Sequence, residues 1–261
     1  MENVDVVVTV LNESRNIQNL INSLLGQTYP CGIIIVDGGS DDGTPEIVQN
    51  FLDRGVILKK QKCSRGEGRN IGVSLSTAPY ILFTDGDAMP DLNWVQCMVK
   101  NLKDSDLVCG LTKNTGNRKY GSLDRVKIYY KDFEVTLPSM NMGIRRDVFL
   151  KVGGFDPSFV TAEDIDLNIR ILERSYIAKE CIECLVIHNA RSNFRGFVRQ
   201  GFWNGYGRKQ LKEKNRDIWK DLERSYFSLK DVSLMWIIRN IAGLLGYAEA
   251  SFILLIKNRR P

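Results

Sequence analysis

Short apolar runs alternate with amphipathic stretches along the first half of the chain. Four runs rich in β-branched residues predict strands at residues 4–11, 32–37, 55–58 and 80–85. The stretches between them, residues 16–25, 45–52 and 66–76, have the spacing of helices, and Thr44 is expected to be the N-cap before Pro45. Strands separated by helices indicate βαβ units. We therefore expect an α/β fold with a mostly parallel sheet and helices on both of its faces.

Polar residues gather where three of the predicted strands end. Thr9 to Glu13 fall at the end of the first strand, Asp37 to Thr44 at the end of the second, and Asp85 to Asp87 at the end of the fourth. Ligands of such sheets bind beyond the carboxyl ends of the strands. These segments are therefore expected to converge on one crevice.

The second of these segments, VDGGSDDGT, presents Asp37, Ser40 and Asp42 before a predicted helix. The chain has neither GxGxxG nor GxxxxGK here, so the segment is neither a dinucleotide fingerprint nor a P-loop. A nucleotide held mainly by side chains fits the pattern. Taken alone, an acidic strand-to-helix turn with a cap explains it equally well.

Asp85 and Asp87 lie two residues apart at the end of a predicted strand, with no basic neighbour beside them in the sequence. A divalent cation between these carboxylates and a ligand phosphate would stabilise both as anions. Oxygen ligands suit Mg²⁺ or Mn²⁺, and magnesium typically takes one or two carboxylates plus substrate phosphates. The pair therefore predicts a site for a metal diphosphate.

Composition is that of a soluble globular protein, with 43% hydrophobic and 26% charged residues among 261. The charge is uneven, because residues 189–261 hold 15 Lys or Arg against 6 Asp or Glu, whereas residues 1–188 hold 21 against 25. The basic C-terminal part is either a solvated tail or a surface for an anionic partner, membrane or nucleic acid.

The N-terminus runs straight into an apolar strand without a leader, which favours a cytoplasmic location. Six scattered cysteines suit reduced thiols in a reducing compartment. Cys181, Cys184 and His188 raise the alternative of a zinc site. A structural zinc needs four ligands and the chain has one Cys-x-x-Cys, so we expect these cysteines to pack as small apolar residues.

Six segments in order resemble the motifs of family 2 glycosyltransferases with the GT-A fold. They are VVTVLNES (7–14), VDGGSDDGT (36–44), SRGEGRNIG (64–72), TDGDAMPDLNWV (84–95), NMGIRRDVFLKVGGFD (141–156) and AEDIDLNIR (162–170). The resemblance covers roughly residues 4 to 207. It implies a GT-A catalytic domain at 1–207, with a nucleotide-sugar-binding half to about 110 and an acceptor-binding half at about 111–207. Residues 208–261 would form a basic, amphipathic helical extension.

The resemblance also implies an inverting, metal-dependent transfer of a sugar from a UDP- or GDP-type donor, with Mn²⁺ or Mg²⁺ as cofactor. The residues matching the donor site are Thr9, Asn12 and Glu13 in the nucleotide pocket, Asp37 at the base or ribose, Arg65 or Arg69 near the donor with Arg65 favoured, Asp85 at the ribose and metal, Asp87 and His188 at the metal, and Arg195 and Arg199 in a basic lid. One departure is Gly38, where many members carry a second Asp that contacts the base. The identity of the base therefore stays open.

Asp164 matches the general base of the family. A base of this kind needs a carboxylate whose pKa is raised by burial or by like charge, and Glu163 and Asp166 lie beside it in the sequence. On a helix, Asp164 and Asp166 point in different directions, so only one should face the substrate. An acidic helix start that interacts with its own macrodipole is the alternative.

The C-terminal part combines basic, aromatic and apolar residues. Residues 191–214 interleave cations and aromatics, as RNA-binding proteins do, but no RNP-type motif accompanies them and no nucleic-acid partner is expected. In residues 231–261, uncharged runs fall short of the ~20 residues of a spanning helix. We expect a helix in the membrane interface, with Trp236 and Tyr247 at headgroup depth and Lys257, Arg259 and Arg260 at anionic lipid. A core helix or a homo-oligomer contact is the alternative.

These patterns together predict a glycosyltransferase on the cytoplasmic face of a membrane, acting on a lipid-linked acceptor of the polyprenyl or dolichyl type, or on another membrane-proximal acceptor. The alternatives are a soluble transferase acting on a saccharide or protein, and a catalytically silent nucleotide-sugar-binding or scaffold protein. The QxxRW signature of processive enzymes is absent from the sequence. The sequence leaves open the sugar, the acceptor and the linkage.

Overall fold

The computed structural model describes residues 2–115, 126–189, 193–224 and 233–257. Within them, one large sheet is built from β1 (Val4–Val10), β2 (Gly32–Asp37), β3 (Val56–Lys60), β4 (Tyr80–Asp85), β5 (Ala88–Pro90), β6 (Leu107–Thr115), β9 (Met142–Arg145) and β10 (Ala178–Asn189). The strands lie in the order β3-β2-β1-β4-β9-β6-β10-β5. The helices are α1 (Ile17–Leu25), α2 (Thr44–Gln49), α3 (Arg65–Leu75), α4 (Trp94–Leu102), α6 (Arg146–Lys151), α7 (Glu163–Glu173), α8 (Phe194–Lys214) and α9 (Leu234–Lys257), with 3-10 turns at Leu52–Arg54 and Ser139–Asn141.

The first half of the sheet has the βαβ arrangement that the sequence predicts. β1 pairs in parallel with β2 and β4, and β2 pairs in parallel with β3. The register places Thr9 opposite Asp85, and Val10 opposite Asp37. The polar strand ends therefore lie side by side at one edge of the sheet, and the prediction of an α/β fold with a mostly parallel sheet is confirmed.

The second half of the sheet is mixed. β9 runs antiparallel to its neighbours β4 and β6, while β10 pairs in parallel with β6 and antiparallel with β5. The β10–β5 register sets His188 opposite Ala88, next in sequence to Asp87. A separate small sheet contains β7 (Ile128–Tyr130), β8 (Phe133–Glu134) and β11 (Glu223–Arg224).

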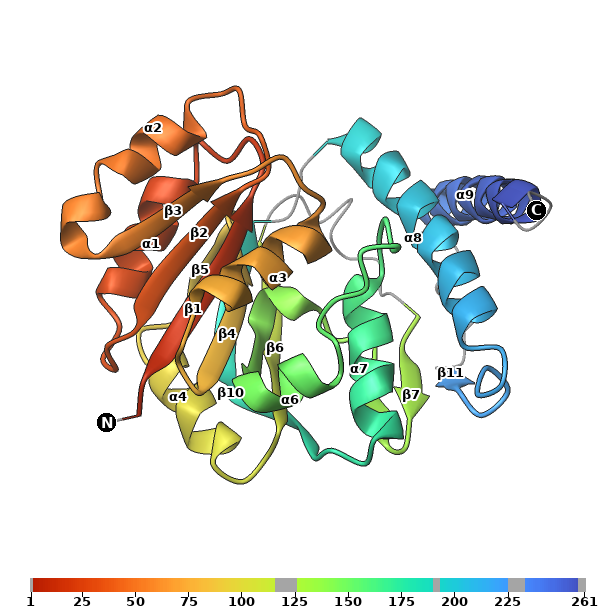
Figure 1. Ribbon diagram of the computed structural model, residues 1–261. Helices are drawn as coiled ribbons and strands as arrows, with labels where there is room; N and C mark the ends of the chain where they lie inside the picture. The colour runs from red at the N-terminus through yellow and green to blue at the C-terminus, as the bar shows by residue number, and fades with distance from the viewer. Residues whose placement is uncertain (1, 116–125, 190–192, 225–232, 258–261) are drawn as a thin grey trace.

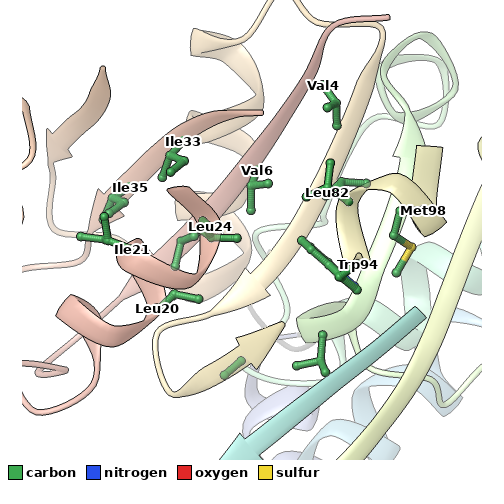
Figure 2. Packing of buried hydrophobic residues seen from close by; sticks show 14 of the residues in the cluster. Val4, Val6, Leu20, Ile21, Leu24, Ile33, Ile35, Leu82, Trp94 and Met98 are labelled. Carbon is green, nitrogen blue, oxygen red and sulfur yellow. The ribbon is translucent and has the colours of Figure 1, made fainter. Parts of the chain in front are cut away.

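Both faces of the sheet are covered by apolar cores, because successive strand residues point to opposite faces. On one face, Val6 and Leu82 pack with residues of α1 and with Trp94 and Met98 of α4 (Figure 2). On the other face, Val7 packs with residues of α3, α6 and α7. There α3 approaches the sheet closely at Gly72, where an added Cβ would lie 2.3 Å from Cγ1 of Val7.

The start of α2 differs from the sequence prediction. The N-cap position belongs to Gly43, which has a left-handed backbone (φ 88°), whereas Thr44 is the first residue of the helix. The Thr44 hydroxyl is used elsewhere: it donates to Oδ1 of Asp42 at 2.5 Å and accepts from the backbone N–H of Glu13 at 2.8 Å. The prediction of a Thr44 N-cap is wrong, because that hydroxyl ties the loop after β1 to the loop after β2.

α8 connects the part of the chain that holds the large sheet to the C-terminal helix α9. It continues without a break across residues 207 and 208, where the sequence predicts the end of the catalytic domain. Lys214 near its end forms ion pairs with Asp166 at 2.8 Å and Asp156 at 2.5 Å. A Cβ on Gly207 would lie 2.8 Å from Cγ2 of Thr161, so α8 packs directly against the loop that leads into α7.

α9 lies on the far side of α8 from the sheet (Figure 1). The two helices approach closely along small residues, since a Cβ on Gly205 would lie 1.8 Å from the carbonyl oxygen of Gly243 and one on Gly246 would lie 1.9 Å from that of Phe202. The other side of α9 exposes large apolar side chains, the most exposed being Leu244 (71%) and Phe252 (68%). By length and composition alone, residues 234–256 are long and apolar enough to cross a membrane. Of the most apolar 18 consecutive residues among them, 17% are buried.

Candidate active site

Carboxylates from two distant segments of the chain converge around Arg65, the first residue of α3. The pKa of Arg65 is raised chiefly by the charge of Asp85, and further by those of Glu163, Asp164 and Asp87. Asp85 is the last residue of β4 and Asp87 follows it, while Glu163 and Asp164 begin α7. Since Coulomb interactions of this kind weaken with distance, these four acidic groups and the exposed Arg65 belong to one site.

Arg69 lies one turn after Arg65 on α3 and is buried, with 1% of its side chain exposed. Its guanidinium donates to Oδ1 of Asp85 at 2.7 Å and to Oε1 of Glu163 at 3.0 Å. The same group lies over the ring of Phe155, 5.3 Å from its centroid. Arg69 therefore links the end of β4 to the start of α7. This leaves Arg65 as the more accessible of the two arginines.

Two opposing effects set the pKa of Asp85. Burial alone would raise it, and the charges of Arg69 and Arg65 more than offset that effect, so the pKa lies below its usual range. Asp85 is therefore an anion at neutral pH.

Asp164 has the opposite electrostatic character. Burial, together with the neighbouring charge of Glu163, raises its pKa to about 6. Its Oδ1 accepts from the backbone N–H of Ile165 at 2.9 Å, and its Oδ2 accepts a longer bond from Ser139 at 3.4 Å. A carboxylate with a pKa near neutrality and a loosely held oxygen can accept a proton from a hydroxyl.

Asp164 and Asp166 of α7 point in different directions, as the helical spacing predicts. Asp166 is fully buried and forms ion pairs with Arg170 and Lys214, both at 2.8 Å. Asp164 instead turns toward Ser139. Asp166 therefore holds α7 and α8 together and leaves Asp164 as the acidic residue of this pair at the site.

The loops after β1 and β2 form a hydrogen-bonded unit. Asn12 has a left-handed backbone (φ 60°); its N–H donates to the Ser40 hydroxyl at 2.9 Å, and its side-chain oxygen accepts from the N–H of Asp41 at 3.0 Å. The Glu13 carboxylate accepts from the side chain of Asn16 at 2.9 Å. Sequence reasoning places Asn12 and Glu13 in a nucleotide pocket, and the structure places them at the rim of the sheet edge.

Unsatisfied polar atoms line this sheet edge. Asp37 is buried, and its Oδ1 accepts from the backbone N–H groups of Gly39 and Ser40 at 3.0 Å. Its Oδ2 and the hydroxyl of Thr9 are buried and have no hydrogen-bond partner in the described part of the chain. Because a buried polar atom without a partner is costly, these two atoms are suited to hydrogen bonds from a bound ligand.

His188 lies beside Asp87. Its Nε2 is 3.3 Å from Oδ2 of Asp87, and its Nδ1 is 2.9 Å from the side-chain oxygen of Asn114. An amide oxygen only accepts, so Nδ1–H donates to Asn114 and Nε2 is the ring nitrogen that faces Asp87. Nε2 is therefore the nitrogen placed to ligate a metal beside Asp87.

Arg195 and Arg199 occupy the first turns of α8, where both side chains are exposed. Among the described residues, they line an open hollow of about 1010 Å³ together with Asn193, Phe194, Gly196, Val198 and Phe202. Within the described residues, no hydrogen bond or ion pair connects either arginine to Asp85, Asp87 or Asp164. The lid role of Arg195 and Arg199 stays a prediction.

The sequence model described as Glycosyl transferase family 2 matches residues 5–152, which is more than half of the chain. This chain belongs to glycosyl transferase family 2. The match includes Thr9, Asp37, Asp85 and Asp87, and it ends before Asp164 and His188.

Two relatives of this family 2 glycosyltransferase come from Haloferax volcanii. Glycosyltransferase AglE is 26% identical over 224 residues, which cover 80% of this chain and 73% of that protein. A glucosyl-dolichyl phosphate glucuronosyltransferase is 25% identical over 274 residues, covering 92% of this chain and 86% of that protein. Among solved structures, a mannosyltransferase from Pyrobaculum calidifontis in complex with GDP-Man and Mn²⁺ matches with a TM-score of 0.67 at 16% identity, covering 99% of this chain and 76% of that one. The structural likeness shows the GT-A fold.

The candidate metal ligands of this glycosyltransferase are the carboxylate oxygens of Asp85 and Asp87 and the imidazole of His188. These ligands fit a hard or borderline divalent cation. Asp87 and His188 are already adjacent, whereas Oδ1 of Asp85 is held by Arg69. Within the described residues, Asp85, Asp87 and His188 do not bring three ligand atoms within 4.8 Å of one another. The Asp87–His188 pair is thus the part of the expected metal site that the fold assembles directly.

Sequence reasoning missed three contributors to the site: Glu163 as a partner of Arg69, Asn114 as the partner of His188, and Ser139 as a donor to Asp164. The position of Glu163 next to Asp164 was the sequence signal that could have pointed to it. Asn114 lies opposite His188 only through the β6–β10 register, and Ser139 lies in a short 3-10 turn. Neither gives a signal in the sequence.

Proposed function

We propose that this chain transfers a sugar from a nucleotide-diphosphate donor, with inversion, to a hydroxyl or phosphate of an acceptor at a membrane surface. The observation that carries the proposal is the contrast between two carboxylates of one site. The pKa of Asp85 is lowered and that of Asp164 is raised to about 6, so the first stays charged while the second can take a proton. Such a division between a binding anion and a general base suits a single in-line displacement.

The donor would bind at the edge formed by β1, β2 and β4. The free buried atoms of Thr9 and Asp37 would bond the nucleoside, with Asn12 and Glu13 at the rim. Arg65 would meet the diphosphate, since it is exposed beside the carboxylates, while Arg69 would hold Asp85 in position. Arg195 and Arg199 would close over the leaving diphosphate.

Asp87 and His188 would hold a divalent cation, Mn²⁺ or Mg²⁺, together with Asp85. When bound there, the cation would compensate the charge of the diphosphate and stabilise it as a leaving group. The mannosyltransferase of similar fold was solved with Mn²⁺ and GDP-Man, which supports a divalent cation and a nucleotide-sugar donor in this chain. The nucleotide of the proposed donor is either UDP or GDP. Many family members carry an Asp that contacts the base where this chain has Gly38, so this position does not identify the base.

The acceptor is proposed to be lipid-linked, of the polyprenyl or dolichyl type. One relative is named for action on glucosyl-dolichyl phosphate, and α9 exposes a row of apolar side chains at the end of the chain. Residues 189–261 also carry a net charge of +9, from 15 basic and 6 acidic residues. Apolar burial and attraction to anionic lipid together favour a peripheral position on a membrane, for which we propose the cytoplasmic face.

Two parts of the C-terminal proposal have different structural support. Trp236 and Tyr247 are half-buried on α9, and Lys209 lies over the Tyr247 ring at 5.5 Å. Arg259, Arg260 and the side chain of Lys257 lie outside the described residues. The proposed boundary between a catalytic domain at 1–207 and an extension at 208–261 falls inside α8, so this helix contributes to both parts.

A thermal-shift screen of nucleotide diphosphates with and without Mn²⁺ tests the donor proposal. A ligand that binds only the folded state raises the melting temperature by mass action, so UDP or GDP with Mn²⁺ should stabilise the wild-type protein. Nucleotide-sugar hydrolysis under the same conditions then separates an enzyme from a silent scaffold. Stabilisation without any hydrolysis or transfer would favour the scaffold, and equal activity on a free saccharide would favour a soluble transferase.

A further inference from the structure

Three thiols from two elements meet on the α4 side of the sheet. Cys97 lies on α4, and Cys181 and Cys184 lie on β10. The Sγ atom of Cys181 is 3.4 Å from that of Cys97 and 2.8 Å from that of Cys184, and all three sulfurs lie within 4.8 Å of one another. We call this group the thiol cluster. Sequence analysis raised a zinc site at Cys181 and Cys184 and set it aside, and it gave no signal for Cys97, which is 84 residues away from Cys181.

An irregularity in β10 creates the thiol cluster. In a regular strand, residues three apart point to opposite faces. The pairing of β10 with β6 shifts from Cys181 opposite Gly110 to Leu185 opposite Leu111, so β10 carries extra residues between these pairs. The bulge turns both sulfurs to one side and leaves Ile182 74% exposed. Bulges commonly re-aim side chains at functional positions.

Asn101 adds a hydrogen-bond donor to the thiol cluster. It lies one turn after Cys97 on α4, and its side-chain N–H₂ donates to the carbonyl of Cys97 at 2.9 Å. The same nitrogen lies 3.3 Å from the sulfur of Cys181, 3.9 Å from that of Cys97 and 4.0 Å from that of Cys184. An N–H group aimed at sulfur stabilises a thiolate more than a thiol. Such outer hydrogen bonds orient metal-bound ligands in proteins.

We propose that Cys97, Cys181 and Cys184 bind a thiophilic divalent cation of the Zn²⁺ type, with the carboxylate of Glu183 as fourth ligand. Oε2 of Glu183 lies 3.4 Å from Sγ of Cys181, on the exposed side of the cluster. Zinc binds thiolates at about 2.3 Å in a tetrahedron, which separates two sulfurs by about 3.8 Å. The Cys181–Cys184 pair must therefore open by about 1 Å, a change within reach of side-chain rotation. Three thiol protons pass to solvent when the cation binds.

The alternative use of two neighbouring thiols is a redox disulfide. A disulfide uses two sulfurs, whereas the fold brings a third, that of Cys97, and the Asn101 amide to the same place. A cation uses all three sulfurs and displaces their protons, so its affinity increases with pH. Bound there, the cation would tie α4 to β10, the strand that carries His188.

Cobalt titration of the reduced full-length protein tests the proposal. Co²⁺ bound to thiolates shows intense sulfur-to-metal charge-transfer absorption, whereas Co²⁺ bound by Asp87 and His188 does not, so the readout is independent of the donor site. We expect one equivalent of Co²⁺ to produce this absorption and Zn²⁺ to abolish it. Cys97→Ser should weaken the binding at least 10-fold, and Glu183→Gln should weaken it less. Cys31→Ser is the matched control, since Cys31 is also half-buried but lies outside the cluster.

Three outcomes would overturn the proposal. The first is the absence of charge-transfer absorption in the wild-type protein, and the second is a loss of Co²⁺ affinity in Cys31→Ser equal to that in Cys97→Ser. The third is rapid formation of a Cys181–Cys184 disulfide with oxidised glutathione in a protein that binds no Co²⁺. Zn²⁺ should also raise the melting temperature of the wild-type protein and not that of Cys97→Ser. The last comparison holds even where the variant is less stable, because each protein is compared with itself.

Discussion

Nη2 of Arg69 lies 2.7 Å from Oδ1 of Asp85, and 1% of the arginine side chain is exposed. The pair joins the end of β4 to α3, and through Glu163 it reaches the start of the helix that carries Asp164. Removing one partner of a buried ion pair costs more than the pair contributes, because the remaining charge is left unpaired.

Arg69→Met should therefore lower the free energy of unfolding by about 3 kcal/mol and weaken nucleotide binding. Denaturant titration measures the first effect, and the thermal shift with a nucleotide diphosphate measures the second. Arg15→Met is the control for stability, since the exposed Arg15 should contribute well under about 1 kcal/mol. Equal stability losses in the two variants would contradict the bridging role of Arg69.

Asp87→Ala should make donor binding insensitive to metal. The variant loses an anionic ligand, so the charge of the diphosphate is less compensated and nucleotide affinity falls together with activity. Isothermal titration with and without EDTA provides the measurement. Nucleotide affinity of the wild-type protein that EDTA leaves unchanged would refute the metal role of Asp87 and His188.

Asn114→Leu should weaken metal binding without touching a ligand. The side-chain oxygen of Asn114 fixes the proton on Nδ1 of His188, at 2.9 Å, and its loss lets the imidazole turn or change tautomer. We expect metal affinity to fall about 10-fold, read from the Mn²⁺ dependence of nucleotide binding. Asn114→Asp, which keeps an acceptor at that position, should restore most of the affinity. A variant without any change in Mn²⁺ dependence would show that Asn114 plays no part.

Transfer should increase with pH through about 6, the pKa of Asp164, because the base must lose its proton before it can accept one. Asp164→Asn should abolish transfer to a hydroxyl acceptor while leaving donor affinity nearly intact. A phosphate acceptor is already anionic, and the same change should then have a much smaller effect. Rates on both acceptor types, measured with this variant, distinguish the two. Loss of donor affinity would mean that Asp164 serves the donor instead.

The same residue should affect stability with a defined sign. A carboxyl group whose pKa is raised on folding stabilises the folded state while it is protonated, and that contribution disappears as pH rises through about 6. Asp164→Asn should therefore be more stable than the wild-type protein at pH 8, and the difference should vanish below about pH 4. Denaturation at the two pH values provides the measurement. A constant difference between them would argue against the raised pKa.

The exposed face of α9 should bind anionic vesicles. Leu244→Gln with Phe252→Gln removes two side chains that are 71% and 68% exposed, so membrane affinity should drop at least 10-fold while the melting temperature stays unchanged. Leu52→Gln is the control, because Leu52 is 47% exposed in a 3-10 turn far along the chain from α9. Vesicle flotation is the assay, and salt should weaken the binding without eliminating it, since apolar burial is not screened. Wild-type protein that stays in the soluble fraction at low salt, or dimerises through α9, would refute the lipid-surface proposal.

The sequence by itself determined the α/β fold, the parallel strands β1 to β4 and the positions of the acidic strand ends. These features follow from local properties: β-branched runs, helical periodicity, and the rule that polar residues after parallel strands share one edge. The order of motifs also determined the family. The sequence did not determine how α2 begins, because the Thr44 hydroxyl bonds to Glu13, which lies in a loop 31 residues away.

Only the tertiary structure decided which charges act together. The raised pKa of Asp164 depends on burial in the folded chain, and the position of Asp85 depends on Arg69 from another helix. The contact of His188 with Asn114 follows from the β6–β10 register, and the thiol cluster follows from a bulge that sets Cys184 beside Cys181 and opposite Cys97 of α4. Contacts between distant segments carry no periodic signal in one sequence, because they are fixed by packing and strand register rather than by local preference.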